Sequence, residues 1–287
     1  INNYLHIGEI FFKGLRSSIE SFETINIYID YKDYNQIEKN RLKIIEAINL
    51  KKFDDVKFKK VRANITYNKK NYLVNLKLKG QRKSHYIDQN KTSLRIELLN
   101  SNIDGIESFS LIKPRIRNYI HEWFFHELSL EGDIPTISYI FVKLKINNQN
   151  RGLYVLEESM RKNIFNRHLK KISPIFTINF DQKESKFFKS TVKVYEQEFW
   201  TNNKKRKSLY DRSLRNFKFF INEKKEFNKI FNLKKLSWFF AVADLTQTYH
   251  GLDPKQLKFY NNPNNNLLEI IPYDGHRFTK NFSKHIK

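Results

Sequence analysis

One carboxylate in this sequence stands where a metal-binding group is commonly presented. Asp274 follows the apolar residues 271–273 and precedes Gly275. A strand fixes the backbone ahead of such an aspartate, and the glycine lets the chain turn away behind it. Asp-Gly by itself more often marks a simple turn. Here the aspartate closes a second strand instead of joining two strands, which favours the metal site.

Three polar residues lie in the segment that leads to Asp274. His250, Asp253 and Gln256 are spaced by three, which places them on one face of a turn. Such a group is typical of a catalytic loop ahead of a metal-binding aspartate. Polar residues in loops are more often simply solvated, so both interpretations stay open.

A stretch of basic and hydroxyl residues lies much earlier in the chain. Lys79, His85, Lys91, Ser93 and Arg95 fall within it. On a strand that faces a cleft, lysine holds phosphate oxygens as a point charge and arginine holds them as a planar fork. The alternative is a solvated strand face in a lysine-rich chain, and the spacing alone favours that alternative.

The elements that position these residues follow from the hydrophobic pattern. Alternation of apolar and polar residues predicts strands at residues 25–31, 61–67, 72–79, 92–99, 139–147, 152–156, 257–260 and 267–272. Helical patterns are found at residues 36–50, 114–130, 209–231 and 236–248. Glu122 and Glu127 lie on the second of these helices, where either is able to pair with a strand lysine, although glutamates on helix surfaces are common.

This order of elements predicts an α+β fold with two lobes, the first rich in strands and the second mostly helical. We expect an N-terminal strand and helix extension over residues 1–60. A strand-rich lobe is expected over residues 61–160, and a helical lobe with a closing hairpin over residues 161–287.

The composition narrows the class of protein. Lysine and arginine outnumber aspartate and glutamate by 53 to 30, so the formal net charge is +23. Such a charge is typical of nucleic-acid-binding proteins. Lys, Asn, Ile, Tyr and Phe are abundant together while Gly and Pro are few, which is the usage of an AT-rich coding sequence, and we favour this explanation of the lysine excess. The absence of cysteine excludes disulfides, thiolate metal sites and cysteine nucleophiles.

Several common classes lack their motifs. The sequence has no Gly-rich P-loop, no Gly-x-Gly-x-x-Gly and no His-Glu-x-x-His. No apolar run approaches the ~18 residues that span a bilayer. Because the chain begins at Ile1 and not at a methionine, we interpret it as an excerpt of a longer protein, and the compartment, cytoplasm or cell envelope and surface, stays open.

Four groups of residues, in order, carry a resemblance to a known family. They are Lys79-Gly80 with His85 and residues 91–96, then Phe109 to Leu111 with Arg115, Arg117 and Glu122-Trp123, then Asn147 with residues 152–158, and last Phe259-Tyr260 with residues 271–274. Together they resemble the CotH kinase family, the spore-coat-associated atypical kinases of bacteria. The resemblance covers about residues 61–278.

The resemblance implies a reduced protein-kinase-like fold that binds ATP with Mg²⁺ or Mn²⁺ and phosphorylates a protein substrate. The residues that would bind the nucleotide are Lys79, Lys91, Arg95, Glu122 and Glu157. The catalytic groups would be Asp274, Asp253 and His250, and the metal ligands Asp274, Gln256 and His276.

The sequence also departs from the family pattern. Family members often carry a second acid after the final aspartate, whereas Gly275-His276 stands here. A catalytically degenerate surface, spore or binding protein is therefore an alternative to the kinase, and a basic nucleic-acid-binding protein is a second alternative.

The charge generates a first prediction. If the lysine excess reflects coding bias, the protein binds DNA and RNA weakly and with little sequence preference. Its affinity falls steeply as salt rises, because only counterion release drives binding. Filter binding or fluorescence anisotropy between about 50 and 200 mM salt measures this. Nanomolar, sequence-selective binding at physiological salt would contradict the prediction.

Overall fold

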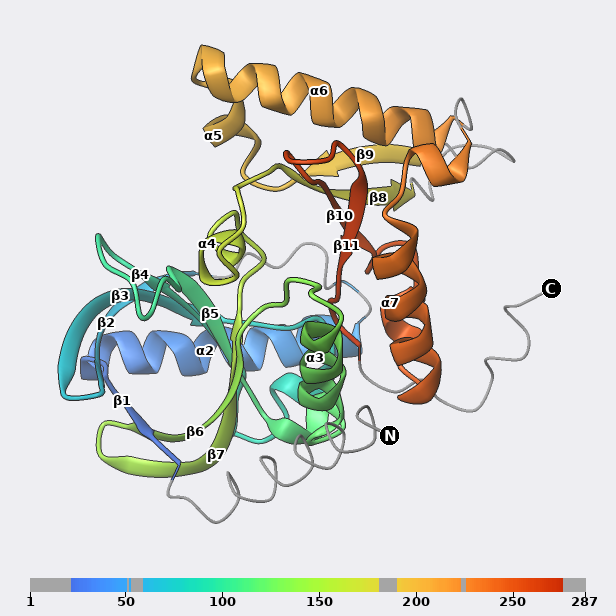
Figure 1. Cartoon of the computed structure of the whole chain (residues 1–287). Coiled ribbons are helices and arrows are strands. Elements are labelled where there is room, and N and C mark those ends of the chain that lie inside the picture. Colours follow the sequence, from blue (N-terminus) through green and yellow to red (C-terminus); the bar gives the residue numbers. More distant parts are fainter. Residues whose placement is uncertain (1–21, 51, 53–58, 181–189, 223–225, 276–287) are drawn as a thin grey trace. The chain divides into compact units, whose positions relative to one another are not determined.

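The computed structural model describes residues 22–50, 52, 59–180, 190–222 and 226–275. The chain folds as two compact units (Figure 1). The first contains the described residues up to Ile116 together with Ser138–Ser159, and the second contains Arg117–Ile137 and the described residues from Met160 onward. Each unit is considered by itself.

The first unit is a closed barrel in the strand order β1-β2-β3-β4-β5-β7-β6. Its strands are β1 (Thr24–Tyr28), β2 (Val61–Tyr67), β3 (Lys70–Leu78), β4 (Leu94–Leu98), β5 (Ser108–Ile112), β6 (Tyr139–Ile146) and β7 (Gln149–Glu158). All neighbours are antiparallel except β1 and β6, whose parallel pairing closes the barrel. Strand β1, which was expected to belong to an N-terminal extension over residues 1–60, is one of the strands of the barrel.

Alternation along the strands sorts side chains to the inside and the outside of the barrel. Buried residues recur at every second position, as at Ile25 and Ile27 in β1 and at Val74, Leu76 and Leu78 in β3. These side chains meet in one apolar core. The period of two in the sequence is therefore the physical signal of the barrel interior.

The strands expected at residues 61–67 and 72–79, and at residues 139–147 and 152–156, form two hairpins of the barrel, each with a tight turn. Asn68 and Lys69 join β2 to β3 with φ angles of 49° and 60°, and Asn147 and Asn148 join β6 to β7 with φ angles of 47° and 64°. Positive φ at both central residues matches the right-handed twist of the flanking strands, and asparagine tolerates it well.

Helix α2 (Tyr31–Asn49) packs on the barrel through one face. Ile37, Asn40, Arg41 and Ile44 are its buried residues, and this i, i+3, i+4, i+7 spacing is that of an amphipathic helix. The helix begins five residues before the predicted start at residue 36. Strand β1 ends at Tyr28, earlier than expected, and only Ile29 and Asp30 separate it from the helix.

The second unit combines helices with a 4-stranded sheet in the order β11-β10-β8-β9 (Figure 1). The strands are β8 (Ile175–Phe180), β9 (Ser190–Val194), β10 (Lys258–Asn261) and β11 (Leu268–Ile271). The α-helices are α3 (His121–Glu131), α4 (Ile164–Arg167), α5 (Gln197–Thr201), α6 (Lys204–Ile221) and α7 (Leu233–Leu245). Within the described residues no helix has both the length and the apolar character needed to cross a membrane.

The mixed α+β class is confirmed, but three details of the sequence prediction are wrong. Strands β5, β8 and β9 were not predicted; β8 and β9 give the second unit a sheet where mostly helix was expected. The helix expected over residues 114–130 is interrupted: a short 3₁₀ turn, Pro114–Arg117, is separated from α3 by Asn118 and Tyr119, whose φ angles are 55° and 62°. Positive φ at these residues ends the helical path. The kinase-like arrangement of two lobes stays a prediction.

A buried carboxylate ties sheet to helix in the second unit. Glu269 of β11 accepts hydrogen bonds from Lys235 Nζ at 2.8 Å, Asn262 Nδ2 at 2.8 Å and Asn232 Nδ2 at 3.0 Å, and also from the Tyr260 hydroxyl. Lys235 and Asn232 belong to the start of α7, where Asn232 is the N-cap. The carboxylate thus fixes where α7 begins relative to β10 and β11.

Glu269 generates a second prediction. Burial alone raises the pKa of this carboxyl, but the hydrogen bonds from Lys235, Tyr260, Asn262 and Asn232 outweigh burial and lower the pKa below 4.5. A lowered folded-state pKa gives stability that is complete above the unfolded value and is lost as pH falls through the folded value. Glu269→Gln should lower the free energy of unfolding at pH 7 by roughly 2–4 kcal/mol and flatten its acid dependence.

Chemical denaturation between pH 3 and pH 7 measures this effect. The matched control is Glu226→Gln, because Glu226 makes only an exposed pair with Lys229, both side chains having 67% exposure. An equal response of the two variants would contradict the assigned role of Glu269.

Candidate functional site

The barrel carries a row of polar side chains on its outer surface. Register pairs Lys77 with Arg95, Arg95 with Ser110, and Ser110 with Glu157 across β3, β4, β5 and β7. Directly paired residues share a face of a sheet. Alternation places Lys79 on the same face as Lys77. Three of the five predicted nucleotide-binding residues, Lys79, Arg95 and Glu157, therefore gather on this face.

A buried ion pair joins two of them. Lys79 Nζ lies 2.8 Å from Glu157 Oε1, and the side chains are 18% and 2% exposed. A carboxylate this deeply buried needs a charged partner or several hydrogen-bond donors. The pair therefore holds the lysine amine at a set place on the face. Glu122 or Glu127 was expected as the partner of a strand lysine, whereas Lys79 pairs with Glu157 of strand β7.

Positive charge is crowded around this pair. Burial first, then the charges of Lys60 and Arg95, lower the pKa of Lys77. Arg95 donates to the Ser159 hydroxyl, a neutral acceptor, and no carboxylate of the described residues lies within ion-pair distance of its guanidinium. We call Lys77, Lys79, Arg95, Ser110 and Glu157 the strand face. Three cations and one carboxylate give it a net positive charge, which suits an anionic ligand.

Lys91, also predicted to bind nucleotide, lies elsewhere in the first unit. It belongs to the loop before β4, and its Nζ is 3.1 Å from the place that a Cβ on Gly152 would occupy. It therefore lies beside the bend of β7, and its role toward phosphate stays a prediction.

Asp274 lies against an arginine and a histidine in the second unit. Its Oδ1 forms an ion pair with Arg117 Nη1, and its Oδ2 lies 3.3 Å from His250 Nε2. Asp274 itself has a φ of 53°, so the backbone turns sharply at the carboxylate. His250 and Asp274, both named as catalytic candidates from the sequence, lie close together, while Arg117 was not anticipated as their neighbour.

Two glycines bring these side chains together. Gly251 and Gly275 pack backbone to backbone, with Gly275 Cα only 3.3 Å from the place that a Cβ on Gly251 would occupy. A Cβ on Gly275 would overlap the Phe125 ring and Thr248 Cγ2. The residue after Asp274 therefore has no room for a side chain, which is a steric reason for glycine at position 275.

Glu122 supports the same loop from α3. It is fully buried, and its Oε1 accepts a hydrogen bond of 2.9 Å from the backbone N of Gly275. His126 Nε2 lies 3.4 Å from the same oxygen, one helical turn further on. Glu122 thus positions the residue next to Asp274, and its predicted contact with nucleotide remains untested.

The remaining predicted residues lie in or near the loop after α7. Asp253 is exposed, and its Oδ1 accepts from the backbone N of Lys255 at 2.9 Å, so it stabilises a turn. Gln256 is half-buried, with its backbone N bonded to Asp253 O at 2.7 Å. His276 lies outside the described residues.

The described side chains do not make up a metal centre. Among them there is no group of three or more His, Asp or Glu residues placed to hold an ion. Asp274 and His250 are close, but Arg117 brings a positive charge to the same carboxylate. Mg²⁺ requires an octahedral oxygen-rich set, and this donor set does not fit it.

A buried lysine that the sequence analysis did not single out lies near this loop. Lys258 is 2% exposed, and its Nζ donates to Thr177 Oγ1 at 3.1 Å. The ammonium lies 5.3 Å from the centre of the Tyr273 ring, beside Asp274 in sequence. Burial, followed by the charge of Lys193, lowers the pKa of Lys258 to about 8. Strand β10 is buried at every position, so the sequence offers no alternation that would mark this lysine as buried.

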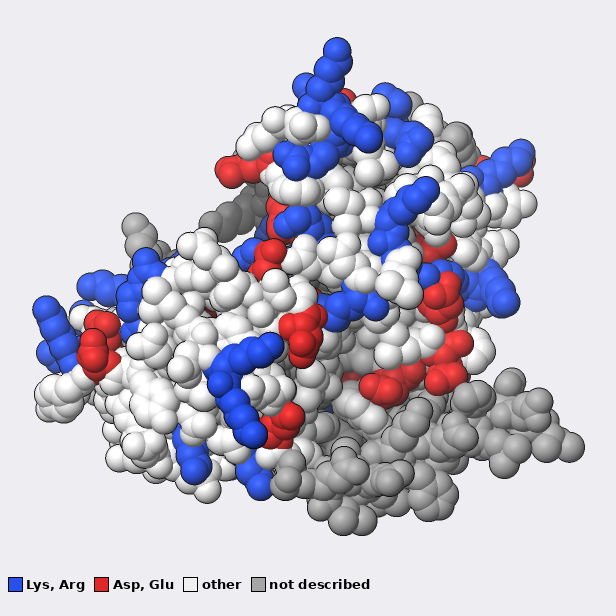
Figure 2. Space-filling model, turned by 60° about the vertical axis from the view of Figure 1, so that its left-hand side comes forward, with Lys and Arg blue, Asp and Glu red and all other residues white. Residues whose placement is uncertain are grey.

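The surface shows no single basic groove on the face that Figure 2 presents. Lysine and arginine side chains are scattered there, and aspartate and glutamate side chains lie among them (Figure 2). A dispersed charge of both signs supports binding of small anions at local clusters more than wrapping of a long polyanion.

Comparison with protein families gives one match. The family model described as CotH kinase protein matches residues 64–284. This match covers most of the chain and agrees with the resemblance found in the sequence. A search of curated proteins found no match.

The glycine contact generates a third prediction. Gly275→Ala should lower the free energy of unfolding by about 1–3 kcal/mol, because its Cβ would overlap Phe125 and Thr248 in a packed region. Gly251→Ala should have a smaller effect, since its nearest neighbour is 3.3 Å away. Denaturant titrations of both variants measure the difference. No loss in Gly275→Ala would show that the Asp274 loop is not packed in this way.

Proposed function

Because the chain belongs to the CotH kinase protein family, we propose that it is an ATP-dependent protein kinase that transfers phosphate to a serine or threonine of a protein. The observation that carries this proposal is the Lys79–Glu157 ion pair on the strand face. In protein kinases a strand lysine, held by a glutamate, contacts the phosphates of ATP.

The strand face supports phosphate binding by its charges. Lys79 is held by Glu157, Arg95 has a neutral hydroxyl as its partner, and the pKa of Lys77 is lowered by burial and by the neighbouring cations Lys60 and Arg95. An anion placed among these groups would relieve their mutual repulsion. The fork of Arg95 and the point charge of Lys79 are complementary means of holding phosphate oxygens.

The Asp274 loop of the second unit carries the groups that we propose for phosphoryl transfer. Phosphoryl transfer depends mainly on positioning and on electrostatic stabilisation, with little covalent chemistry for the protein to perform. Asp274 is held by Glu122 through Gly275 and by His250, and His250 is the described side chain placed to exchange a proton with it. Mg²⁺ or Mn²⁺, which the family implies, is proposed to bind together with the nucleotide.

A second candidate function is a catalytically degenerate binding protein. The observation that favours it is the Arg117 guanidinium on Asp274, together with the lack of a three-ligand metal group in the described residues. Such a protein would keep the strand face for nucleotide and lose transfer. The discriminating measurement is phosphate transfer itself, since nucleotide binding is expected of both.

The ion pair generates a fourth prediction. Lys79→Met leaves the Glu157 carboxylate buried, so it should lower the free energy of unfolding by roughly 3 kcal/mol. The double variant Lys79→Met/Glu157→Gln should recover most of this loss, because neither charge is then stranded. If Lys79 contacts phosphate, the double variant still loses the rise in melting temperature that ATP causes in the wild type. Recovery of both stability and ATP response would make the pair purely structural.

The kinase proposal is tested directly with labelled ATP. Purified protein is incubated with Mg²⁺ or Mn²⁺ and a generic protein acceptor, and Asp274→Asn serves as the variant of equal size. We expect wild-type transfer, its loss in Asp274→Asn with the fold retained, and higher activity with Mn²⁺ if His276 is a ligand, because imidazole suits Mn²⁺ better. Nucleotide binding without transfer under either cation would select the degenerate alternative.

A further inference from the structure

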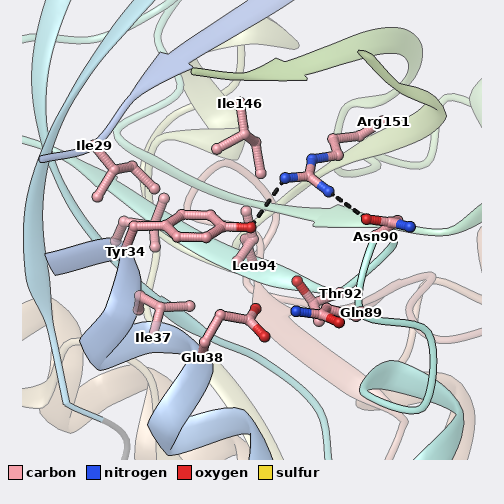
Figure 3. Close-up of a pocket in the computed structure, with 11 residues that line it drawn as sticks. Ile29, Tyr34, Ile37, Glu38, Gln89, Asn90, Thr92, Leu94, Ile146 and Arg151 are labelled. Carbon is pink, nitrogen blue, oxygen red and sulfur yellow. Dashed lines mark hydrogen bonds between the residues drawn. The ribbon is translucent and has the colours of Figure 1, made fainter. Parts of the chain in front are cut away.

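A small pocket lies in the first unit between α2 and the barrel, outside the strand face (Figure 3). Its floor is apolar and includes Leu76 and Leu94. Tyr34 and Glu38 reach it from α2, and Arg151 enters it from β7. The space open to the centre of a water-sized group is about 10 Å³, so the pocket takes a small ligand.

Arg151 is turned into this pocket by an irregularity in the barrel. In the β6–β7 ladder Leu144 pairs with Gly152 and Lys145 pairs with Asn150, so Arg151 is an extra residue with no partner across the ladder. Such a β-bulge redirects the side chain of the extra residue. Gly152 follows with a φ of 80°, which a residue with a side chain rarely adopts. In a hairpin without the bulge, the Arg151 side chain would not point into the pocket.

The guanidinium of Arg151 is buried, with 6% exposure, yet its partners are uncharged. It donates to Asn90 Oδ1 at 2.8 Å and to the Tyr34 hydroxyl at 3.0 Å (Figure 3). It also donates to Gln149 Oε1 at 2.9 Å. Its Nε has no hydrogen-bond partner among the described residues. Nor does any carboxylate of the described chain lie in ion-pair contact with it. A buried charge of this kind is costly unless an opposite charge compensates it.

The carboxylates near the pocket do not supply that charge. Glu38 lines the pocket, but its Oε2 accepts from Arg41 Nε at 3.0 Å, so its charge is already balanced. Asp88 and Arg151 act on the Tyr154 hydroxyl with opposite signs, yet Asp88 also faces the charge of Lys113. Lys91 adds a further ammonium beside Gly152. The pocket therefore lies in a region of net positive charge.

We propose that this pocket is a binding site for a small monovalent anion, a carboxylate group or a chloride ion, that compensates the buried guanidinium of Arg151. The Glu38 carboxylate in its wall disfavours an anion that carries a second negative charge. The apolar floor suits the carbon end of a carboxylate. This site is independent of the proposed phosphoryl transfer, because it shares no residue with the strand face.

The test is thermal unfolding of the full chain at constant ionic strength. Sodium isethionate, whose anion is the largest of the four, is replaced stepwise by sodium formate, acetate or chloride. A ligand that binds only the folded state raises the melting temperature by roughly 3–5 °C for each tenfold increase above its Kd in a chain of this size. A rise with formate or acetate alone assigns a carboxylate, and a rise with chloride alone assigns a halide; either supports the site.

Arg151→Met removes the charge and keeps most of the side-chain length, so the response to the anion should disappear. The matched control is Arg62→Met, since Arg62 is an exposed residue of β2 in the same unit, and it should respond as the wild type does. The same response in Arg151→Met as in the wild type, or no response in the wild type, overturns the proposal and leaves the pocket to water.

A second measurement uses only the wild type, in case Arg151→Met does not fold. The ³⁵Cl resonance of dilute chloride should broaden in the presence of the protein, and added formate should narrow it by competition. Broadening that formate leaves unchanged would assign chloride contacts to the general basic surface and would also overturn the proposal.

Discussion

Closure of the first unit depends on one parallel pairing, β1 against β6. Once a sheet is closed, every regular strand residue points either into the packed interior or outward, because no free edge remains to change the alternation. The outward positions of β3, β4, β5 and β7 then bring Lys77, Arg95, Ser110 and Glu157 into one row. The strand face therefore follows from the closure of the barrel. The order of the strands also brings Lys79, just after β3, to Glu157 of β7.

The bulge in β7 is the exception that the closed barrel accommodates. An extra residue between two paired positions lets Arg151 point into the pocket. Further along β7, Leu156 and Glu157 keep a regular register. The same strand therefore contributes to two separate groups of charges, one at each end. At the strand face a lysine compensates the buried carboxylate, whereas at the pocket a buried guanidinium has only neutral protein partners.

The second unit places its polar groups by different means. Glu269 gathers donors from α7 and β10 at a buried point, which anchors the helix to the sheet. At the other end of the sheet, close packing of Gly251 on Gly275 brings His250 near Asp274. Glu122 holds the backbone of Gly275, the residue after Asp274. Arg117 completes this group. The geometry at these two places depends on hydrogen bonds between residues far apart in the sequence and on glycines that allow close packing. Local propensity does not determine it.

The sequence by itself determined the features that depend on short-range pattern. Period-two alternation and asparagine-rich turns identified both barrel hairpins, and the family motifs named Lys79, Arg95 and Glu157 before their common face was known. Only the tertiary structure decided the rest. Strand β5 is buried at every position and so lacks alternation, β8 pairs with the distant strand β10, and Arg117 reaches Asp274 across more than half of the chain. The bulge at Arg151 likewise exists only against β6, because register belongs to a pair of strands and neither sequence contains it alone.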